Sequence, residues 1–313
     1  MQTHSQSQAY QDVHPARLSS RLMLALGLTL AFVVIEALAG LAANSLALLT
    51  DAAHNLTDVF ALALTWYALR LTLQPANARQ TYGYHRAGIL AALVNATTLA
   101  LVALGIFYEA WQRFMAPPDV QAGILVIVGA AALVVNLVTA LLIRRGSQGD
   151  LNVRAAFVHL LGDVFTALGA VVAGVIIYFT GLNRLDPLVS VFIGLLILWN
   201  AWGILREAID ILLESSPRDV DMSAMLREVM QVDGVLGVHD LHVWSISSGL
   251  RSMSAHVVTD DISISAGSAI QARINQLLSR RYKIGHATLQ LECVYCTQDG
   301  LFCGMDGSSA PRP

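Results

Sequence analysis

The stretch Q-A-G-I-L-V-I-V-G-A-A-A-L-V-V-N-L-V-T-A-L-L-I, residues 121–143, contains no Asp, Glu, Lys, Arg or His. It is long enough to cross the hydrocarbon core of a bilayer, which takes about 20 apolar residues in a helix. Similar stretches occur on both sides of it, so the sequence predicts an all-α membrane domain of six transmembrane helices. The six stretches are residues 22–42, 46–69, 87–108, 121–143, 156–179 and 188–205.

The composition of the whole chain agrees with a membrane protein. Of its 313 residues, 55% are hydrophobic and 13% are charged, whereas soluble domains contain about 25% charged residues. The formal net charge is −3. Because a phosphate-binding surface needs a basic excess, we predict no nucleic-acid partner, and the lipid bilayer is the expected surrounding.

Basic residues in short loops stay on the cytoplasmic side of a membrane and therefore predict the orientation. Two arginines, Arg113 and Arg184, fall on one side of the predicted bundle. Eight fall on the other side: Arg17, Arg21, Arg70, Arg79, Arg86, Arg144, Arg145 and Arg154. Both termini are thus predicted to be cytoplasmic. The first 20 residues are polar and do not resemble a cleavable signal peptide, so we expect a multi-pass protein of the cell inner membrane.

A more polar segment follows the last apolar stretch. Its pattern predicts a helix at 219–232, strands at 236–247 and 251–259, a helix at 265–282 and a strand at 286–294. This αββαβ order is typical of an α+β open-faced sandwich, with two helices on one face of a three-stranded sheet. The predicted domains are therefore an N-terminal arm at 1–20, a membrane domain at 21–206, a cytoplasmic domain at 207–296 and a flexible tail at 297–313.

Few ionisable side chains fall inside the predicted spans, and each is costly there, by about 2.5–3.5 kcal/mol on insertion scales. They are Glu36, Asp51, His54, Asp58, His159 and Asp163. Such groups are expected to face the protein interior and to be functional. The alternative, a group near a span end that reaches water, fits Asp51 and Glu36 better than the others.

Two pairs among these residues share one spacing. His54 and Asp58 are four residues apart, as are His159 and Asp163, so each pair lies on one helical face. Two imidazoles and two carboxylates suit tetrahedral Zn²⁺. Imidazole also accepts Co²⁺, whereas an all-oxygen set would favour Mn²⁺ or Mg²⁺. We predict a zinc site, with Cd²⁺ and Co²⁺ as alternatives; hydrogen bonding between helices is the competing role for these side chains.

Short motifs follow one another along nearly the whole chain. They are S-L-A-L-L-T-D-A-A-H-N-L-T-D at 45–58, Y-G-Y-H-R at 82–86, I-L-A-A-L-V-N-A at 89–96, H-L-L-G-D at 159–163, D-P-L-V-S at 186–190, V-H-D-L-H-V-W at 238–244, A-H-V-V at 255–258 and H-A-T-L-Q-L-E-C at 286–293. In this order they resemble the cation diffusion facilitators, a family of proton-coupled zinc exporters.

The resemblance implies six transmembrane helices, a metallochaperone-like cytoplasmic domain and a homodimer that works by alternating access. It implies that the transported ion is held by His54, Asp58, His159 and Asp163, with protons as the counter-ion. The chain is therefore expected to be a secondary active transporter and not an enzyme. Two features depart from the family pattern: Gly88 stands where an acidic residue is common, and residues 144–152 contain no histidine.

The predicted cytoplasmic domain concentrates further ligand types. The resemblance suggests His256, His286 and Glu292 as the core of a regulatory metal site that senses metal and stabilises the dimer. His242, Cys296 and Cys303 are candidates to complete one or two such sites. The alternative is that His239 and His242 form hydrogen bonds within the sheet and that the cysteines are free thiols.

Two other functions stay open at this point. An intramembrane metalloenzyme would need a coordination position open to water, whereas four protein ligands close the site, and the chain has no H-E-x-x-H helix. A metal-gated channel or receptor would use the same ligands. Transport against a gradient distinguishes an exporter from a channel.

Overall fold

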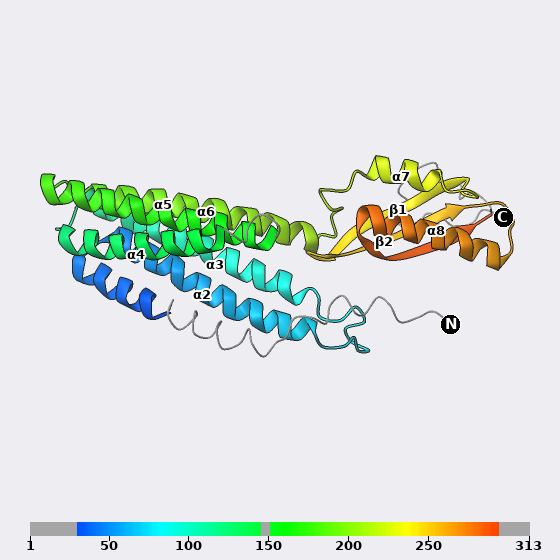
Figure 1. Ribbon diagram of the computed structural model, residues 1–313, viewed down its shortest axis with the longest axis horizontal. Coiled ribbons are helices and arrows are strands. Elements are labelled where there is room, and N and C mark those ends of the chain that lie inside the picture. The colour runs from blue at the N-terminus through cyan, green and yellow to red at the C-terminus, as the bar shows by residue number, and fades with distance from the viewer. Residues whose placement is uncertain (1–29, 145–150, 294–313) are drawn as a thin grey trace. The chain divides into compact units, whose positions relative to one another are not determined.

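The computed structural model describes residues 30–144 and 151–293 (Figure 1). Within these ranges some residues are described by their backbone alone: 142–144, 151–156, 158 and 159. The predicted N-terminal arm and C-terminal tail lie outside the described residues. The chain divides into two compact units, one of residues up to 66 and 94–204, the other of 67–93 and the residues from 205 onward. Each unit is described by itself below.

The first unit is a bundle of long helices that run beside one another (Figure 1). The described part of the first helix is Leu30–Ala43. It is followed by α2 (Leu46–Thr72), α3 (Ala87–Met115), α4 (Ala122–Arg144), α5 (Leu151–Thr180) and α6 (Leu185–Leu212). Four of the described helices, α3 to α6, have the length and apolarity of membrane spans. The apolar surface of α2 is interrupted by the ionisable residues that the sequence singles out.

Several helices extend beyond the predicted apolar stretches. Helix α3 continues to Met115 instead of ending at 108, and α6 begins at Leu185 and ends at Leu212 instead of covering 188–205. In the added turns of α3, Arg113 Nε donates a hydrogen bond to Glu109 Oε1 over 2.9 Å. Apolarity marks the part of a helix that crosses the bilayer, whereas polar i,i+4 pairs of this kind continue the helix past it.

Small residues bring α4 and α5 close together. A Cβ added at Gly174 would lie 2.8 Å from Val126 Cγ2, and one added at Gly129 would lie 3.1 Å from Val171 Cγ2. Close approach over glycine is a common way for membrane helices to gain packing contacts. Buried side chains join these helices to α2 in one apolar cluster: Ala43, Ala47, Leu48, Ala122, Leu125, Ala170 and Ile177. This packing holds α5 beside α2.

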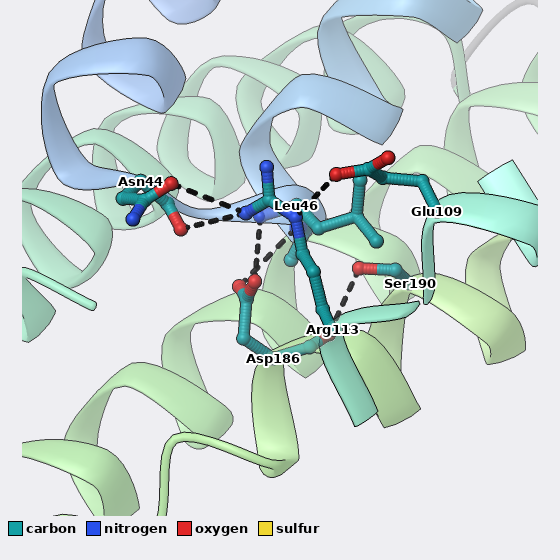
Figure 2. A network of polar contacts seen from close by, with 7 residues as sticks. Asn44, Leu46, Glu109, Arg113, Asp186 and Ser190 are labelled. Atoms are coloured by element: carbon teal, nitrogen blue, oxygen red, sulfur yellow. Dashed lines mark hydrogen bonds and ion pairs between the residues drawn. The ribbon is translucent and has the colours of Figure 1, made fainter. Parts of the chain in front are cut away.

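A buried carboxylate caps the start of α2 (Figure 2). Asp186, in the first turn of α6, is 1% exposed. It accepts hydrogen bonds of 2.5 Å from Ser45 Oγ and 2.5 Å from the Leu46 N–H, and one of 3.2 Å from the Ala47 N–H. The first N–H groups of a helix have no partner within it and form the positive end of its dipole. Asp186 therefore fixes this end of α2 to α6.

Arg113 binds the same turn from α3 (Figure 2). Its Nη1 donates a hydrogen bond of 2.9 Å to the carbonyl oxygen of Asn44. Asn44 has a φ of 53°, in the left-handed region that Asn tolerates better than most residues. Together the contacts of Asp186 and Arg113 fix the start of α2 relative to α6 and α3, and hence the position of the ionisable residues that follow on it.

The second unit contains a small α/β domain. Its elements are α7 (Met222–Met230), β1 (Gly237–Ser247), β2 (Leu250–Val258), α8 (Ile264–Tyr282) and β3 (Ile284–Glu292). This is the predicted order of helices and strands. The strands lie in the order β1-β2-β3, with β1 and β2 antiparallel and β2 and β3 parallel, so α8 is the crossover between the parallel strands.

One apolar core holds this domain together, with side chains from both helices and all three strands. Its largest fully buried members include Met225 of α7, Leu241 of β1, Met253 of β2 and Ile274 of α8. Asp221 caps α7, since its Oδ1 accepts from the Ser223 and Ala224 N–H groups.

An ion pair joins β2 to the segment before α7. Arg251 Nη2 lies 2.7 Å from Asp219 Oδ1. The Arg251 guanidinium holds the pKa of the Asp219 carboxyl below its usual range by donating hydrogen bonds to it.

Strand β1 contains a bulge that the sequence does not reveal. His239 pairs with His256 and His242 pairs with Ser254, so β1 has one more residue than β2 between the same two pairs. Asp240, inside the bulge, has a φ of 50°. In a regular strand, residues three apart point to opposite faces. The extra residue instead places His239 and His242 on the same face of the sheet as His256.

Candidate metal sites

Three of the four predicted membrane ligands converge in the helix bundle. His54 Nε2 lies 3.7 Å from Asp58 Oδ2, one turn further along α2. It lies 3.6 Å from Asp163 Oδ1 on α5. His54 and Asp163 are 6% and 8% exposed. An imidazole nitrogen is thus held between two carboxylates in a largely apolar setting.

These separations match the edge of a zinc tetrahedron. Zinc bonds of about 2.0–2.1 Å to nitrogen and oxygen place two ligand atoms about 3.3–3.4 Å apart at a tetrahedral angle. The observed separations of His54 Nε2 from Asp58 and Asp163, 3.7 and 3.6 Å, exceed this by a few tenths of an ångström. The donor types and these two separations suit a divalent cation, whereas among the described residues only His239, His256 and Glu292 bring three ligand atoms within 4.8 Å of one another.

The fourth predicted ligand, His159, lies in α5 one turn before Asp163. Its side chain is outside the described residues. Its place in the site therefore stays a prediction, based on the i,i+4 spacing that puts it on the same helical face as Asp163.

Two further acidic residues lie buried near this site. Glu36 on the first helix is 0% exposed and Asp51 on α2 is 4% exposed. Glu36 Oε2 accepts a hydrogen bond of 3.1 Å from Asn55 Nδ2. Thr166 Oγ1 on α5 lies 3.2 Å from Asp51 Oδ1 and so donates to it. The expectation that these two carboxyl groups reach water at span ends is wrong, because neighbouring helices cover both.

A second cluster lies on the β-sheet of the other unit. His239 Nε2 is 3.1 Å from Glu292 Oε2, and His256 Nδ1 is 2.9 Å from Glu292 Oε1. The two imidazole rings are 5.0 Å apart between centroids. One ligand atom from each of these three residues lies within 4.8 Å of the others. Two histidines and a carboxylate at this spacing are a donor set that Zn²⁺ accepts.

Asp240 extends this cluster. Its Oδ1 lies 3.0 Å from His242 Nε2, and its Oδ2 lies 3.8 Å from His256 Nε2. Imidazoles and carboxylates therefore alternate from His242 through Asp240, His256 and Glu292 to His239. His242 is in contact with a carboxylate but is not among the three residues that could share one metal ion with His239.

The expected grouping of His256, His286 and Glu292 differs from the one observed. His286 pairs with Ser252 and lies six residues before Glu292 on β3, about 20 Å away along an extended strand. His239 takes its place because it faces His256 directly across the ladder. The parallel pairing of β2 with β3 brings Glu292, and not His286, to His256, and the bulge in β1 turns His239 toward the same residue.

No cysteine is among the three residues of the described cluster. Cys296 and Cys303 lie outside the described residues, so their proposed role there stays a prediction. Cys293, directly after Glu292, is an exposed free thiol.

Comparison with known proteins assigns the family. Residues 22–213 match the family described as cation efflux transmembrane domain, and residues 217–294 match the one described as cation efflux protein, cytoplasmic domain. The chain belongs to the cation efflux family, the cation diffusion facilitators. Membership and the apolar helices make it a multi-pass membrane protein of a transporter family.

Similar proteins span nearly the same length. The metal cation efflux system protein CzcD of Cupriavidus metallidurans is 35% identical over 91% of this chain and 90% of its own. The zinc transporter ZitB of Escherichia coli is 35% identical over 94% of this chain and 93% of its own. The cadmium, cobalt and zinc/H(+)-K(+) antiporter of Bacillus subtilis is 38% identical over 83% of this chain and 85% of its own.

Proposed function

We propose that this cation efflux protein exports Zn²⁺ from the cytoplasm in exchange for protons, with Cd²⁺ and Co²⁺ as further cargoes. The observation that carries the proposal is the His54 imidazole held between Asp58 and Asp163 inside an apolar bundle. The names of the relatives, a zinc transporter and a cadmium, cobalt and zinc antiporter, support this choice of cargo.

The proposal includes the arrangement predicted from the sequence. Six helices cross the inner membrane, both termini are cytoplasmic, and two copies of the chain form a dimer. The positions of the arginines support this orientation. In it, α2 starts at the outer side, where Asp186 caps it, and runs toward the cytoplasm.

Energetics favour coupled exchange over a passive pathway. Moving a dication outward against 100 mV, inside negative, costs about 4.6 kcal/mol, and an entering proton returns about 2.3 kcal/mol of this. A channel under the same potential would admit zinc. Export therefore needs a counter-ion that moves down its own gradient.

The ligands themselves can exchange metal for protons. Zinc binds neutral imidazole and ionised carboxylate, so protons and metal compete for the same atoms. In the proposed cycle, zinc enters from the cytoplasm and displaces protons from the site of His54, Asp58, His159 and Asp163. It leaves when protons from the outer side return to the same groups. The imidazoles suit this role because histidine titrates near neutral pH.

The sheet cluster is proposed as a regulatory site that senses metal and stabilises the dimer. His239, His256 and Glu292 supply its ligands, with Asp240 bridging to His242. With metal bound, Glu292 and the two imidazoles would each bind the same ion instead of contacting one another directly. Such a site would tie β1, β2 and the end of β3 together.

The test is uptake of ⁶⁵Zn²⁺ into everted membrane vesicles or proteoliposomes with an imposed pH gradient. The parent is compared with Asp163→Asn and with Asp119→Asn, an isosteric change at an exposed carboxylate. We expect gradient-dependent accumulation by the parent and the control and none by Asp163→Asn. Uptake that persists in Asp163→Asn would move the site elsewhere. Uptake that never exceeds equilibrium would indicate a channel, and release of a reaction product would indicate an enzyme.

A further inference from the structure

The buried carboxyl groups of Glu36 and Asp51 form a pair that the transport site does not use. Both are almost fully inaccessible, at 0% and 4% exposure. Glu36 Oε1 receives no hydrogen bond from a donor group in the described part of the chain. Its other carboxyl oxygen accepts from Asn55, one turn after Asp51 on α2, so the two buried carboxyl groups lie at neighbouring turns of α2 and interact electrostatically. No Lys or Arg occurs between residues 22 and 69 to neutralise the pair from its own helices.

Two buried carboxyl groups this close together require a proton. An ionised carboxylate can only accept hydrogen bonds, so two carboxyl groups bond to each other only when one of them is protonated. Two carboxylates that share a buried site repel when both are ionised, and such pairs hold one proton between them. Asn55, which donates to Glu36, and Thr166, which donates to Asp51, satisfy other oxygens of the pair.

The pair lies beside the metal site but is separate from its ligands. Asp51 precedes His54 by three residues on α2, and it interacts electrostatically with both His54 and Asp163. Glu36 faces Asp51 and Asn55 on α2 and interacts electrostatically with Asp163 on α5. In the proposed orientation the pair is on the outer side of His54.

We propose that Glu36 and Asp51 form a proton-binding site, distinct from the metal ligands, that releases its proton to water when Zn²⁺ occupies the site at His54. A dication next to Asp51 favours the form in which both carboxyl groups are ionised. Because coupling between two sites is reciprocal, a proton on the pair lowers the affinity of the neighbouring site for the metal. The outer position lets entering protons reach the pair before they reach the metal ligands. This inference rests on the proposed function.

The experiment counts protons released per zinc bound. Full-length protein in detergent is titrated with Zn²⁺ by calorimetry in buffers of different ionisation enthalpy. Glu36→Gln replaces the protonated carboxyl by a neutral group that still donates to Asp51. We expect the variant to release about one proton fewer per zinc than the parent. In the pH range where the pair titrates, the apparent zinc affinity should rise about tenfold more per pH unit in the parent than in the variant. Asp119→Asn should match the parent. Zinc binding at the sheet cluster releases the same number of protons in the parent and in Glu36→Gln, so it does not affect the difference between them.

An equal proton count in parent and Glu36→Gln would overturn the inference. Failure of the proposed function would give a different result in the same titration, because the parent and Asp163→Asn would then bind zinc with the same affinity. Where Glu36→Gln does not fold, as judged by thermal unfolding, infrared difference spectroscopy of the parent replaces it. Zinc must then remove the band of a protonated carboxyl group, and an unchanged band contradicts the proposal.

Discussion

Asp240 shows how one residue can define a site. Its left-handed backbone, with a φ of 50°, lies in the bulge that turns His239 toward His256. Its carboxylate also contacts His242. Asp adopts this conformation more readily than most residues because its side chain forms local hydrogen bonds. A strand without this bulge would place His239 and His242 on opposite faces and divide the cluster.

The first prediction compares two histidines of the sheet. In an Asp163→Asn background, which removes a proposed ligand of the membrane site, His239→Ala should weaken zinc binding by at least about tenfold, the scale on which even indirect partners of a metal act. His286→Ala should leave the affinity unchanged, because His286 lies far along β3. Calorimetric titration of the full-length protein measures both. A loss of affinity with His286→Ala instead would restore the grouping predicted from the sequence.

At the scale of elements, the capped start of α2 gives the second prediction. Asp186→Ala leaves buried N–H groups of α2 and the Ser45 hydroxyl without their acceptor. Each unsatisfied buried group costs about 1–3 kcal/mol, so the variant should unfold at clearly lower temperature than the parent. Ser190→Ala removes a single hydrogen bond to the Asp186 carbonyl and should lower the melting temperature less. Equal melting temperatures for the two variants would mean that the cap contributes nothing.

The third prediction concerns the contact of α4 with α5. Gly174→Ala places a methyl group 2.8 Å from Val126 Cγ2, and such overpacking costs about 1–3 kcal/mol. Gly169→Ala, on the same helix, meets Val189 at an ordinary 3.6 Å. It should be neutral or stabilising, since alanine favours helix more than glycine does. Thermal unfolding in detergent compares the two. A Gly174→Ala variant as stable as Gly169→Ala would show that the helices separate easily.

The elements also show how far the sequence can predict this structure. Apolar length located the helices, and the i,i+4 spacing of His54 with Asp58 correctly placed these two candidate ligands on one face of α2. The ends of α3 and α6 depend on polar pairs and caps from other helices, such as Asp186 on α2, which no local pattern reveals. The choice of His239 over His286 depends on a bulge and on a parallel register, both of which arise only when strands pair.

At the scale of the whole molecule, the two proton sites together predict the charge moved per cycle. On the two proposals above, the pair of Glu36 and Asp51 would contribute one proton, and displacement at His54 and its carboxylates would contribute one more. Two protons in exchange for one Zn²⁺ leave no net charge to cross the membrane. Export should then depend on the pH gradient and be independent of the membrane potential.

Proteoliposomes test this when the potential is set by a gradient of a lipophilic cation. Each pH unit should change the zinc accumulation ratio of the parent about a hundredfold, because two protons at about 1.4 kcal/mol each drive one ion. In Glu36→Gln one proton remains, so each unit should give about tenfold and 100 mV should oppose export by about 2.3 kcal/mol. A parent that responds to the potential in the same way as the variant would show that the pair does not take part in transport, because coupling through it requires the second proton.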